Sequence, residues 1–156
     1  YQVGFGFTGD KLFELAGQAS VSMNRRVPGP EISSEQMRRR DWWDGPELFV
    51  VVDDYDLMTK GQGMGSTLDP LLPLLAQGVS IGLHVIVARS TSGAMRAMMD
   101  PVLRRMWELG TPATLLSYPK EEGKFLGEAA PRKLPPGRAQ LVTRRGVSLI
   151  QTGYVE

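Results

Sequence analysis

Residues 49–56, which read Phe-Val-Val-Val-Asp-Asp-Tyr-Asp, constrain the fold of this chain more than any other stretch. Four consecutive apolar residues without polar alternation are typical of a strand buried on both faces of a parallel sheet. Asp53 and Asp54 follow at once, so two carboxylates stand at the carboxyl edge, where open α/β sheets bind ligands. This is the pattern of a Walker B strand, whose first carboxylate holds Mg²⁺ while the second orients a water molecule. The alternative is a core strand whose aspartates only cap the next loop.

The order of the other predicted elements favours the first interpretation. Further strands are predicted at residues 83–88, 113–117, 138–143 and 147–151. Helices are predicted at residues 11–26, 34–40, 70–78, 93–109 and 121–126. A helix between two apolar strands is a βαβ unit, which implies parallel strands, whereas the last two strands are joined by Arg144-Arg145-Gly146 as an antiparallel hairpin. The predicted fold class is therefore α/β, a mostly parallel sheet flanked by helices with a hairpin at its edge.

Capping residues and apolar stripes define these helices more closely. Asp10 and Asp69 are predicted as N-caps, and Ser33 with Gln36 forms a capping box. Asp100-Pro101 re-caps the helical stretch 93–109 in its middle. The methionines of that stretch (Met95, Met98, Met99 and Met106) line one side, and we interpret them as core rather than as a surface for partners.

Composition limits the classes of function. At 156 residues, with 42% apolar and 22% charged side chains, residues 1–156 are expected to form one globular domain. With a net charge of +1, nothing in the overall composition demands nucleic acid or an anionic membrane as a partner. The chain has no cysteine and a single histidine, which excludes disulfides, thiolate chemistry and a histidine-rich zinc site.

A phosphate-binding loop is not apparent in the sequence. Gly4 and Gly9 have the separation of a Walker A motif, but Asp10 stands where the motif requires lysine. Leu12 follows Lys11 in place of serine or threonine. A carboxylate directed at phosphate would repel it, so we assign this segment no phosphate role.

Five segments, taken in chain order, resemble one family. They are residues 42–48 (WWDGPEL), 50–57 (VVVDDYDL), 81–89 (IGLHVIVAR), 100–105 (DPVLRR) and 134–138 (LPPGR). Together they are similar to the last, C-terminal ATPase module of the EccC proteins, the FtsK/SpoIIIE-type ATPases of type VII (ESX) secretion in actinobacteria. The resemblance extends from Pro28 to Gln151 and implies a RecA-like P-loop NTPase core.

The resemblance also implies a nucleotide site with ATP and Mg²⁺ as cofactors. By motif match, Asp53 is the Mg²⁺ carboxylate and Asp54 occupies the position of a catalytic glutamate. Arg89 and Ser90 stand where active motors carry the threonine and glutamine of a sensor segment. We expect low or no hydrolysis and weak or regulatory nucleotide binding for three reasons. Walker A is absent, Asp54 is one methylene shorter than glutamate, and the two sensor residues are replaced.

The partners that the resemblance implies are proteins. They are the C-terminal export signal of Esx-type secreted heterodimers, the other ATPase modules of the same protein and the membrane components of the secretion complex, in an assembly of hexameric type. The implied location is the cytoplasmic face of the plasma membrane, with this domain itself soluble. We expect the export signal to bind through apolar surface rather than charge. Two alternatives stay open, an active ATPase and an FtsK-like DNA translocase, the second disfavoured by the near-neutral charge.

Overall fold

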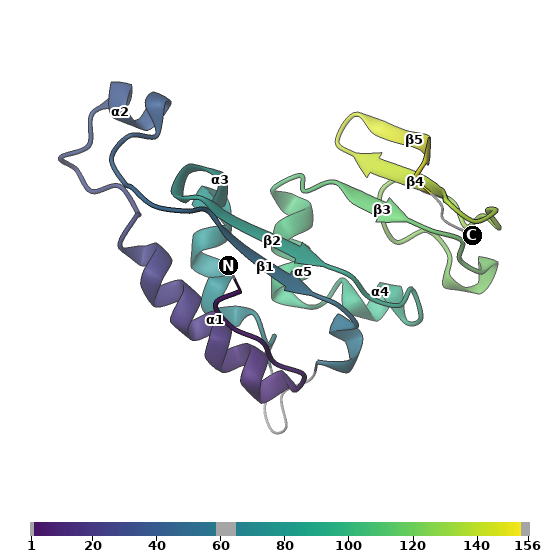
Figure 1. Ribbon diagram of the computed structural model, residues 1–156. Helices are drawn as coiled ribbons and strands as arrows, with labels where there is room; N and C mark the ends of the chain where they lie inside the picture. The colour runs from purple at the N-terminus through teal and green to yellow at the C-terminus, as the bar shows by residue number, and fades with distance from the viewer. Residues whose placement is uncertain (1, 59–64, 154–156) are drawn as a thin grey trace. The chain divides into compact units, whose positions relative to one another are not determined.

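The computed structural model describes residues 2–58 and 65–153, which fold into two compact units, Tyr1–Arg89 and Ser90–Glu156 (Figure 1). Residues 59–64 lie outside the described residues. Among the described residues, no helix combines the length and the apolarity needed to cross a bilayer.

The first unit is built on a parallel strand pair. Strand β1 (Leu48–Val52) pairs in parallel with β2 (Leu83–Val87), in a register that sets Leu48 beside Leu83. The remaining elements are α1 (Gly9–Asn24), α2 (Ser34–Arg39), η1 (Tyr55–Leu57), η2 (Asp69–Gln77) and α3 (Gly78–Ile81). Because η2 and α3 connect two parallel strands, the predicted crossover unit is confirmed.

The connection between β1 and β2 is wound more tightly than predicted. Residues 69–77 form a 3₁₀ helix, and only Gly78–Ile81 is α-helical. Pro70 and Pro73 lack backbone N–H groups, and a proline ring inside an α-helix clashes with the carbonyl one turn earlier. The fully buried apolar side chains of this connection are Leu68, Leu71 and Ile81, and α1 packs against η2.

Two of the predicted helix caps are wrong, whereas two others are confirmed. Helix α1 is capped by Thr8, whose Oγ1 accepts the Lys11 N–H at 3.2 Å, so Asp10 lies in the first turn instead. Asp69 is the first residue of η2, and its Oδ2 accepts the N–H of Ser66 at 2.9 Å rather than an N–H of the helix. The capping box before α2 and the cap at Asp100 are present as predicted.

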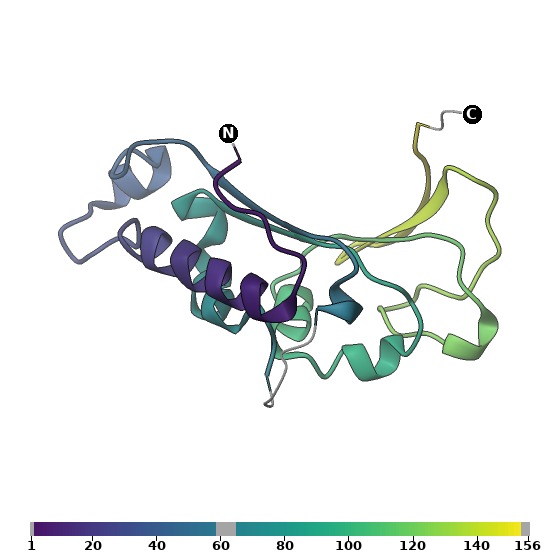
Figure 2. The same ribbon diagram turned by 60° about the horizontal axis from the view of Figure 1, so that its bottom comes forward.

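The strand pair is not buried on both faces. Phe49, Val51 and Ile86 are 58%, 67% and 50% exposed, whereas Val52 and Leu83 are buried. The parallel register sets Phe49 beside His84 on the exposed face, with the two rings stacked at 4.5 Å. Burial alternates along β1 because α1, η2 and α3 lie on one side of the strand pair (Figure 2).

Trp43 packs at the amino end of the strand pair. Its Nε1 donates to the carbonyl oxygen of Ser80 at 2.8 Å, and the guanidinium of Arg26 lies 4.3 Å from the ring centroid. Gly82 ends α3 with φ +72°, and a Cβ there would lie 2.7 Å from the Trp43 ring. The tryptophan therefore has a packing role in this unit.

The second unit contains an antiparallel sheet in the order β3-β4-β5. Its elements are α4 (Ala94–Ala97), α5 (Pro101–Glu108), β3 (Ala113–Leu115), η3 (Lys120–Glu122), β4 (Arg138–Thr143) and β5 (Gly146–Gln151). The predicted hairpin is confirmed, with Gly146 at φ +128° directly after the two-residue loop. Only a 3₁₀ turn forms where a helix was predicted at 121–126, because Gly123 at φ +63° ends it.

A small apolar cluster holds the second unit together. Leu115, Tyr118, Ala129 and Val142 are buried, with Trp107 and Phe125 among the side chains packed against them. The methionine prediction is wrong in part, because Met95 and Met99 are exposed. Helix α5 is eight residues long, and Val102 is its buried residue.

Candidate functional site

The predicted carboxylates lie at the carboxyl edge of the parallel strand pair. Val52 is buried and the next two residues, Asp53 and Asp54, are exposed. Backbone hydrogen bonds continue beyond the strands, since the N–H of Ala88 donates to Val52 O at 2.8 Å and the N–H of Tyr55 donates to Ala88 O at 3.0 Å. These two bonds place the turn that carries both aspartates directly beside the segment that ends in Arg89.

The backbone of Asp54 has an unusual conformation. Its φ and ψ are 48° and 44°, in the left-handed region, which aspartate tolerates better than most residues but which is costly for a bulky side chain. Asp53 Oδ1 accepts the N–H of Asp54 at 3.0 Å, and the carbonyl of Asp54 accepts the N–H of Leu57 at 2.8 Å. The turn thus orients the Asp53 carboxylate through its own backbone while leaving the side chain exposed.

A buried polar cluster that the sequence analysis missed supports this turn. The Tyr55 hydroxyl hydrogen-bonds Ser66 Oγ, which also accepts the N–H of Leu68 at 3.1 Å. Thr67 Oγ1 and Asp69 Oδ1 are buried, and neither has a hydrogen-bond partner among the described residues. The only signal in the sequence is a Ser-Thr pair shortly before Pro70, which on its own reads as an ordinary helix start.

The other two predicted site residues lie at the division between the units. Arg89 is the last residue of the first unit, and Ser90 is the first residue of the second. Ser90 Oγ accepts the N–H of Ser92 at 3.1 Å, which folds the chain into a tight turn there. The structure therefore brings Asp53, Asp54 and the Arg89 segment to one edge of the first unit, and Ser90 begins the next.

The carboxyl edge suits a hydrated magnesium ion better than an ion enclosed by protein ligands. Among residues 2–58 and 65–153, no cluster of three or more His, Asp or Glu side chains could enclose a metal. Mg²⁺ in nucleotide sites is commonly held by one or two carboxylates, with water and phosphate oxygens completing its octahedron. Asp53 fits that requirement because its carboxylate is exposed, is oriented by the N–H of Asp54 and lies at the edge of a parallel sheet.

The amino-terminal segment has a different arrangement from a phosphate-binding loop. Gly4 and Gly6 lie against the side chains of Leu15 and Lys11 of α1. Lys11 Nζ forms an ion pair with Glu14 at 2.8 Å, and Thr8 already caps the helix. These contacts bind the segment to its own helix.

Comparison with known proteins relates the whole chain to one family. No family model matches the chain. It is 42% identical, over its full length, to part of the ESX secretion system protein EccC of Thermomonospora curvata, and it spans 12% of that protein. It is 44% identical, over 85% of its length, to part of the ESX-4 secretion system protein EccC4 of Mycobacterium tuberculosis, of which the match covers 11%.

Solved structures give the same result. The cytoplasmic domain of the T. curvata type VII secretion ATPase EccC superposes with a TM-score of 0.89 at 42% identity, covering 99% of this chain and 18% of that one. A structure of T. curvata EccC ATPases 2 and 3 in complex with a signal sequence peptide superposes with a TM-score of 0.88 at 42% identity, again over 99% of this chain and over 28% of the other.

These likenesses define an ATPase domain of the type VII secretion class, with the mixed α/β fold that the sequence predicts. The chain belongs to the EccC family, and it fits the C-terminal ATPase module of these proteins.

Proposed function

We propose that this chain is a degenerate ATPase module of a type VII secretion motor, which recognises the C-terminal export signal of Esx-type substrates and binds nucleotide weakly or as a regulator. One observation carries this proposal. The relative that was solved in complex with a signal sequence peptide is 42% identical and covers 99% of this chain. The other ATPase modules of the same protein, the membrane components of the secretion complex and a hexameric assembly are the further partners we propose.

The arrangement at the carboxyl edge supports a nucleotide role with little hydrolysis. Asp53 has the exposure and orientation required to bind Mg²⁺ of an ATP–Mg²⁺ complex. A catalytic base must lie within about 3 Å of its water, and Asp54 combines a short side chain with a left-handed backbone. Arg89 and Ser90 complete the proposed nucleotide site in place of the sensor threonine and glutamine.

A catalytically active module is the second candidate, and the exposed Asp53 carboxylate directly after a parallel strand supports it. The two candidates differ in what Asp53 does. In the degenerate module its loss abolishes binding, whereas in an active module its loss also abolishes turnover.

Calorimetric titration with ATP and Mg²⁺, together with a phosphate-release assay, separates the two candidates. The wild-type chain is compared with Asp53→Ala and with Asp41→Ala, an exposed aspartate on the amino-end side of β1 that serves as a matched control. We expect weak binding that is lost in Asp53→Ala and kept in the control, with phosphate release no faster than in buffer. Steady phosphate release that disappears in Asp53→Ala would establish the active module instead. Binding that survives in Asp53→Ala would contradict the assignment of Asp53 as the metal carboxylate.

Recognition of the export signal is tested separately by fluorescence anisotropy with a labelled synthetic peptide of an Esx substrate tail. We expect saturable binding with a shallow dependence on salt, because apolar contacts are screened little by ions. Binding that weakens steeply as salt is added would show that charge dominates recognition. A peptide that fails to saturate the chain would contradict the recognition proposal itself.

A further inference from the structure

The turn that follows β1 is held in a conformation that is unfavourable for most residues. Asp54 lies in the left-handed region, with φ 48° and ψ 44°. A residue with a side chain keeps such a conformation only where its surroundings fix the chain on both sides. On the amino side the chain is fixed by β1, since Val52 is buried and its carbonyl accepts the N–H of Ala88 at 2.8 Å. The stability of the turn therefore depends on what fixes the chain on the carboxyl side.

Tyr55 fixes the carboxyl side in two ways. Its backbone N–H donates to Ala88 O at 3.0 Å, which continues the parallel pairing beyond the strands. Its side chain is buried, so the phenol hydroxyl needs a hydrogen-bond partner inside the unit. One such partner is Ser66 Oγ. This bond ties the turn to a segment that lies eleven positions further along the chain.

Ser66 is itself held in place at the start of η2. Its Oγ accepts the N–H of Leu68 at 3.1 Å, and its own N–H donates to Asp69 Oδ2 at 2.9 Å. Gly65, at φ +132°, lets the Asp69 carboxylate approach closely, because a Cβ at Gly65 would overlap Asp69 Oδ2. Leu68 is fully buried, so this arrangement is attached to the core of the unit. The Ser66 hydroxyl is therefore a fixed point to which the turn is tied.

The tie acts on the Asp53 carboxylate through a short path. Asp53 Oδ1 accepts the N–H of Asp54 at 3.0 Å, so the orientation of the carboxylate depends on the direction of that N–H. Because the left-handed conformation is unfavourable, a turn released from Ser66 would relax, and the N–H would turn away from the carboxylate. A metal ligand that has lost its orientation binds its ion less tightly.

We propose that Tyr55 and Ser66 are positioning residues for the Asp53 carboxylate, because the bond between their hydroxyl groups holds the turn in the conformation in which Asp53 can bind the Mg²⁺ of an ATP–Mg²⁺ complex. This inference rests on the proposed function, in which Asp53 is the metal carboxylate. Linkage makes the effect reciprocal, so that metal binding strengthens the bond by the same factor by which the bond strengthens metal binding. The start of η2 should therefore be stabilised when ATP and Mg²⁺ bind, although it supplies no proposed ligand.

Calorimetric titration of the intact chain with ATP and Mg²⁺ tests the positioning role. Tyr55→Phe keeps the buried ring and removes its hydroxyl, and Ser66→Ala removes the partner from the other side of the same bond. Tyr118→Phe is the matched control, because it also removes a buried phenol hydroxyl. That hydroxyl lies in the second unit and donates to Ala129 O at 3.4 Å.

We expect Tyr55→Phe to weaken the affinity for ATP with Mg²⁺ about fivefold. This is less than the tenfold or more that follows the loss of a partner bonded directly to a metal ligand. The number of sites per chain should stay at the wild-type value, whereas a variant that only loses folded chains would lose sites and keep its affinity. Ser66→Ala should weaken binding at least as much, and adding Tyr55→Phe to it should weaken binding no further, since the bond is already absent. Tyr118→Phe should bind as the wild type does.

Hydrogen exchange of single amides gives a readout that a purely structural role would not change. The N–H of Leu68 is bonded to Ser66 Oγ, so ATP with Mg²⁺ should slow its exchange in the wild type, by up to about fivefold. In Tyr55→Phe this slowing should be absent. Without nucleotide, the N–H of Asp54 should exchange faster in Tyr55→Phe than in the wild type, because its bond to Asp53 Oδ1 forms less often.

The outcomes separate this inference from the proposed function. A wild-type chain that binds ATP with Mg²⁺, together with a Tyr55→Phe chain of the same affinity, would overturn the positioning role and leave the nucleotide function standing. An equal loss of affinity in Tyr118→Phe would also overturn it, since any buried hydroxyl would then have the same effect. Slowing of Leu68 exchange that persists in Tyr55→Phe would refute the reciprocal coupling. A wild-type chain that binds no nucleotide contradicts both proposals.

Discussion

Replacement of Gly82 by alanine tests how the amino end of the parallel strand pair is held together. Gly82 has φ +72°, a conformation that costs roughly 1–2 kcal/mol for a residue with a side chain. The new methyl carbon would lie 2.7 Å from Cη2 of Trp43, closer than carbon atoms pack. The ring cannot retreat freely, because its Nε1 is bonded to Ser80 O and its face is covered by Arg26. Moving it weakens contacts that are together worth about 1–2 kcal/mol.

The lower entropy of the unfolded alanine variant offsets part of this loss, by about 0.4–1 kcal/mol. We therefore expect Gly82→Ala to lower the free energy of unfolding by about 2 kcal/mol, measured by urea titration. Gly17→Ala is the matched control, because a Cβ at Gly17 meets no atom within 4 Å and the residue lies inside α1. That variant should be more stable than the wild type by about 0.5–1 kcal/mol.

A second background separates the two contributions to the Gly82→Ala effect. In a Trp43→Leu chain the steric contact is absent, so the same substitution should cost only the backbone part, about 1 kcal/mol. Gly82→Ala with the stability of the wild type would refute the whole reasoning. An equal cost in both backgrounds would refute the role of the Trp43 contact alone.

Three further predictions concern caps and titrating groups. Asp100→Ala removes the acceptor for two backbone N–H groups of α5, at 2.9 and 3.0 Å, and should lower the unfolding free energy by about 1 kcal/mol, whereas Asp100→Asn should have little effect in the same urea titration. Hydrogen bonds with Arg40, the larger cause, and with His84 hold the pKa of the Glu47 carboxyl below its usual value of 4.5. The contribution of these interactions to stability is therefore present above pH 4.5 and is lost as the pH falls through the lower folded pKa. The stability difference between wild type and Glu47→Gln should therefore be larger above pH 4.5 and shrink in acid. Burial raises the pKa of the Tyr118 phenol, so its ionisation in an ultraviolet titration should occur above pH 10 and be missing in Tyr118→Phe.

Local features of the fold were predictable because they depend on neighbours in the chain. The capping box at Ser33 and Gln36, the cap at Asp100 and the hairpin around Gly146 each involve residues a few positions apart. The misplaced cap at Asp10 shows the limit of that reasoning. Thr8 and Asp10 are both good capping residues, and only the path of the chain entering α1 decides between them.

Long-range arrangement was not predictable in the same way. The apolar run at residues 49–52 reads as a strand buried on both faces, yet exposure depends on which segments cover each face, and that is a property of the packed unit. The support of the Asp53 turn by Tyr55 and Ser66 was missed for the same reason, since these residues lie eleven positions apart in the chain and meet only in the packed unit.

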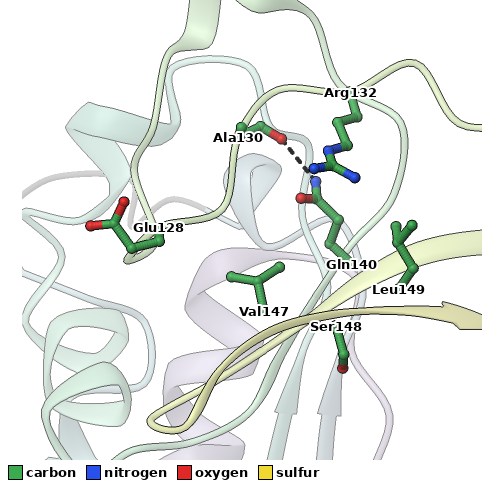
Figure 3. Close-up of a pocket in the computed structure, with 7 residues that line it drawn as sticks. All are labelled: Glu128, Ala130, Arg132, Gln140, Val147, Ser148 and Leu149. Atoms are coloured by element: carbon green, nitrogen blue, oxygen red, sulfur yellow. Dashed lines mark hydrogen bonds between the residues drawn. The ribbon is translucent and has the colours of Figure 1, made fainter.

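The sequence by itself determined the strands, two of the helix caps, the hairpin and the family, because these follow from local periodicity and from motifs that survive in order along the chain. The tertiary structure alone decided where the concave surfaces of the second unit lie. One is an apolar groove at Trp107, Val142 and Val147, and the other is a polar pocket at Arg132 and Gln140 (Figure 3). Trp107, Val142 and Val147 come from three different elements, and Arg132 meets Gln140 from a loop. No spacing in the sequence brings such residues together, because their proximity is produced by the folding of the sheet over its core.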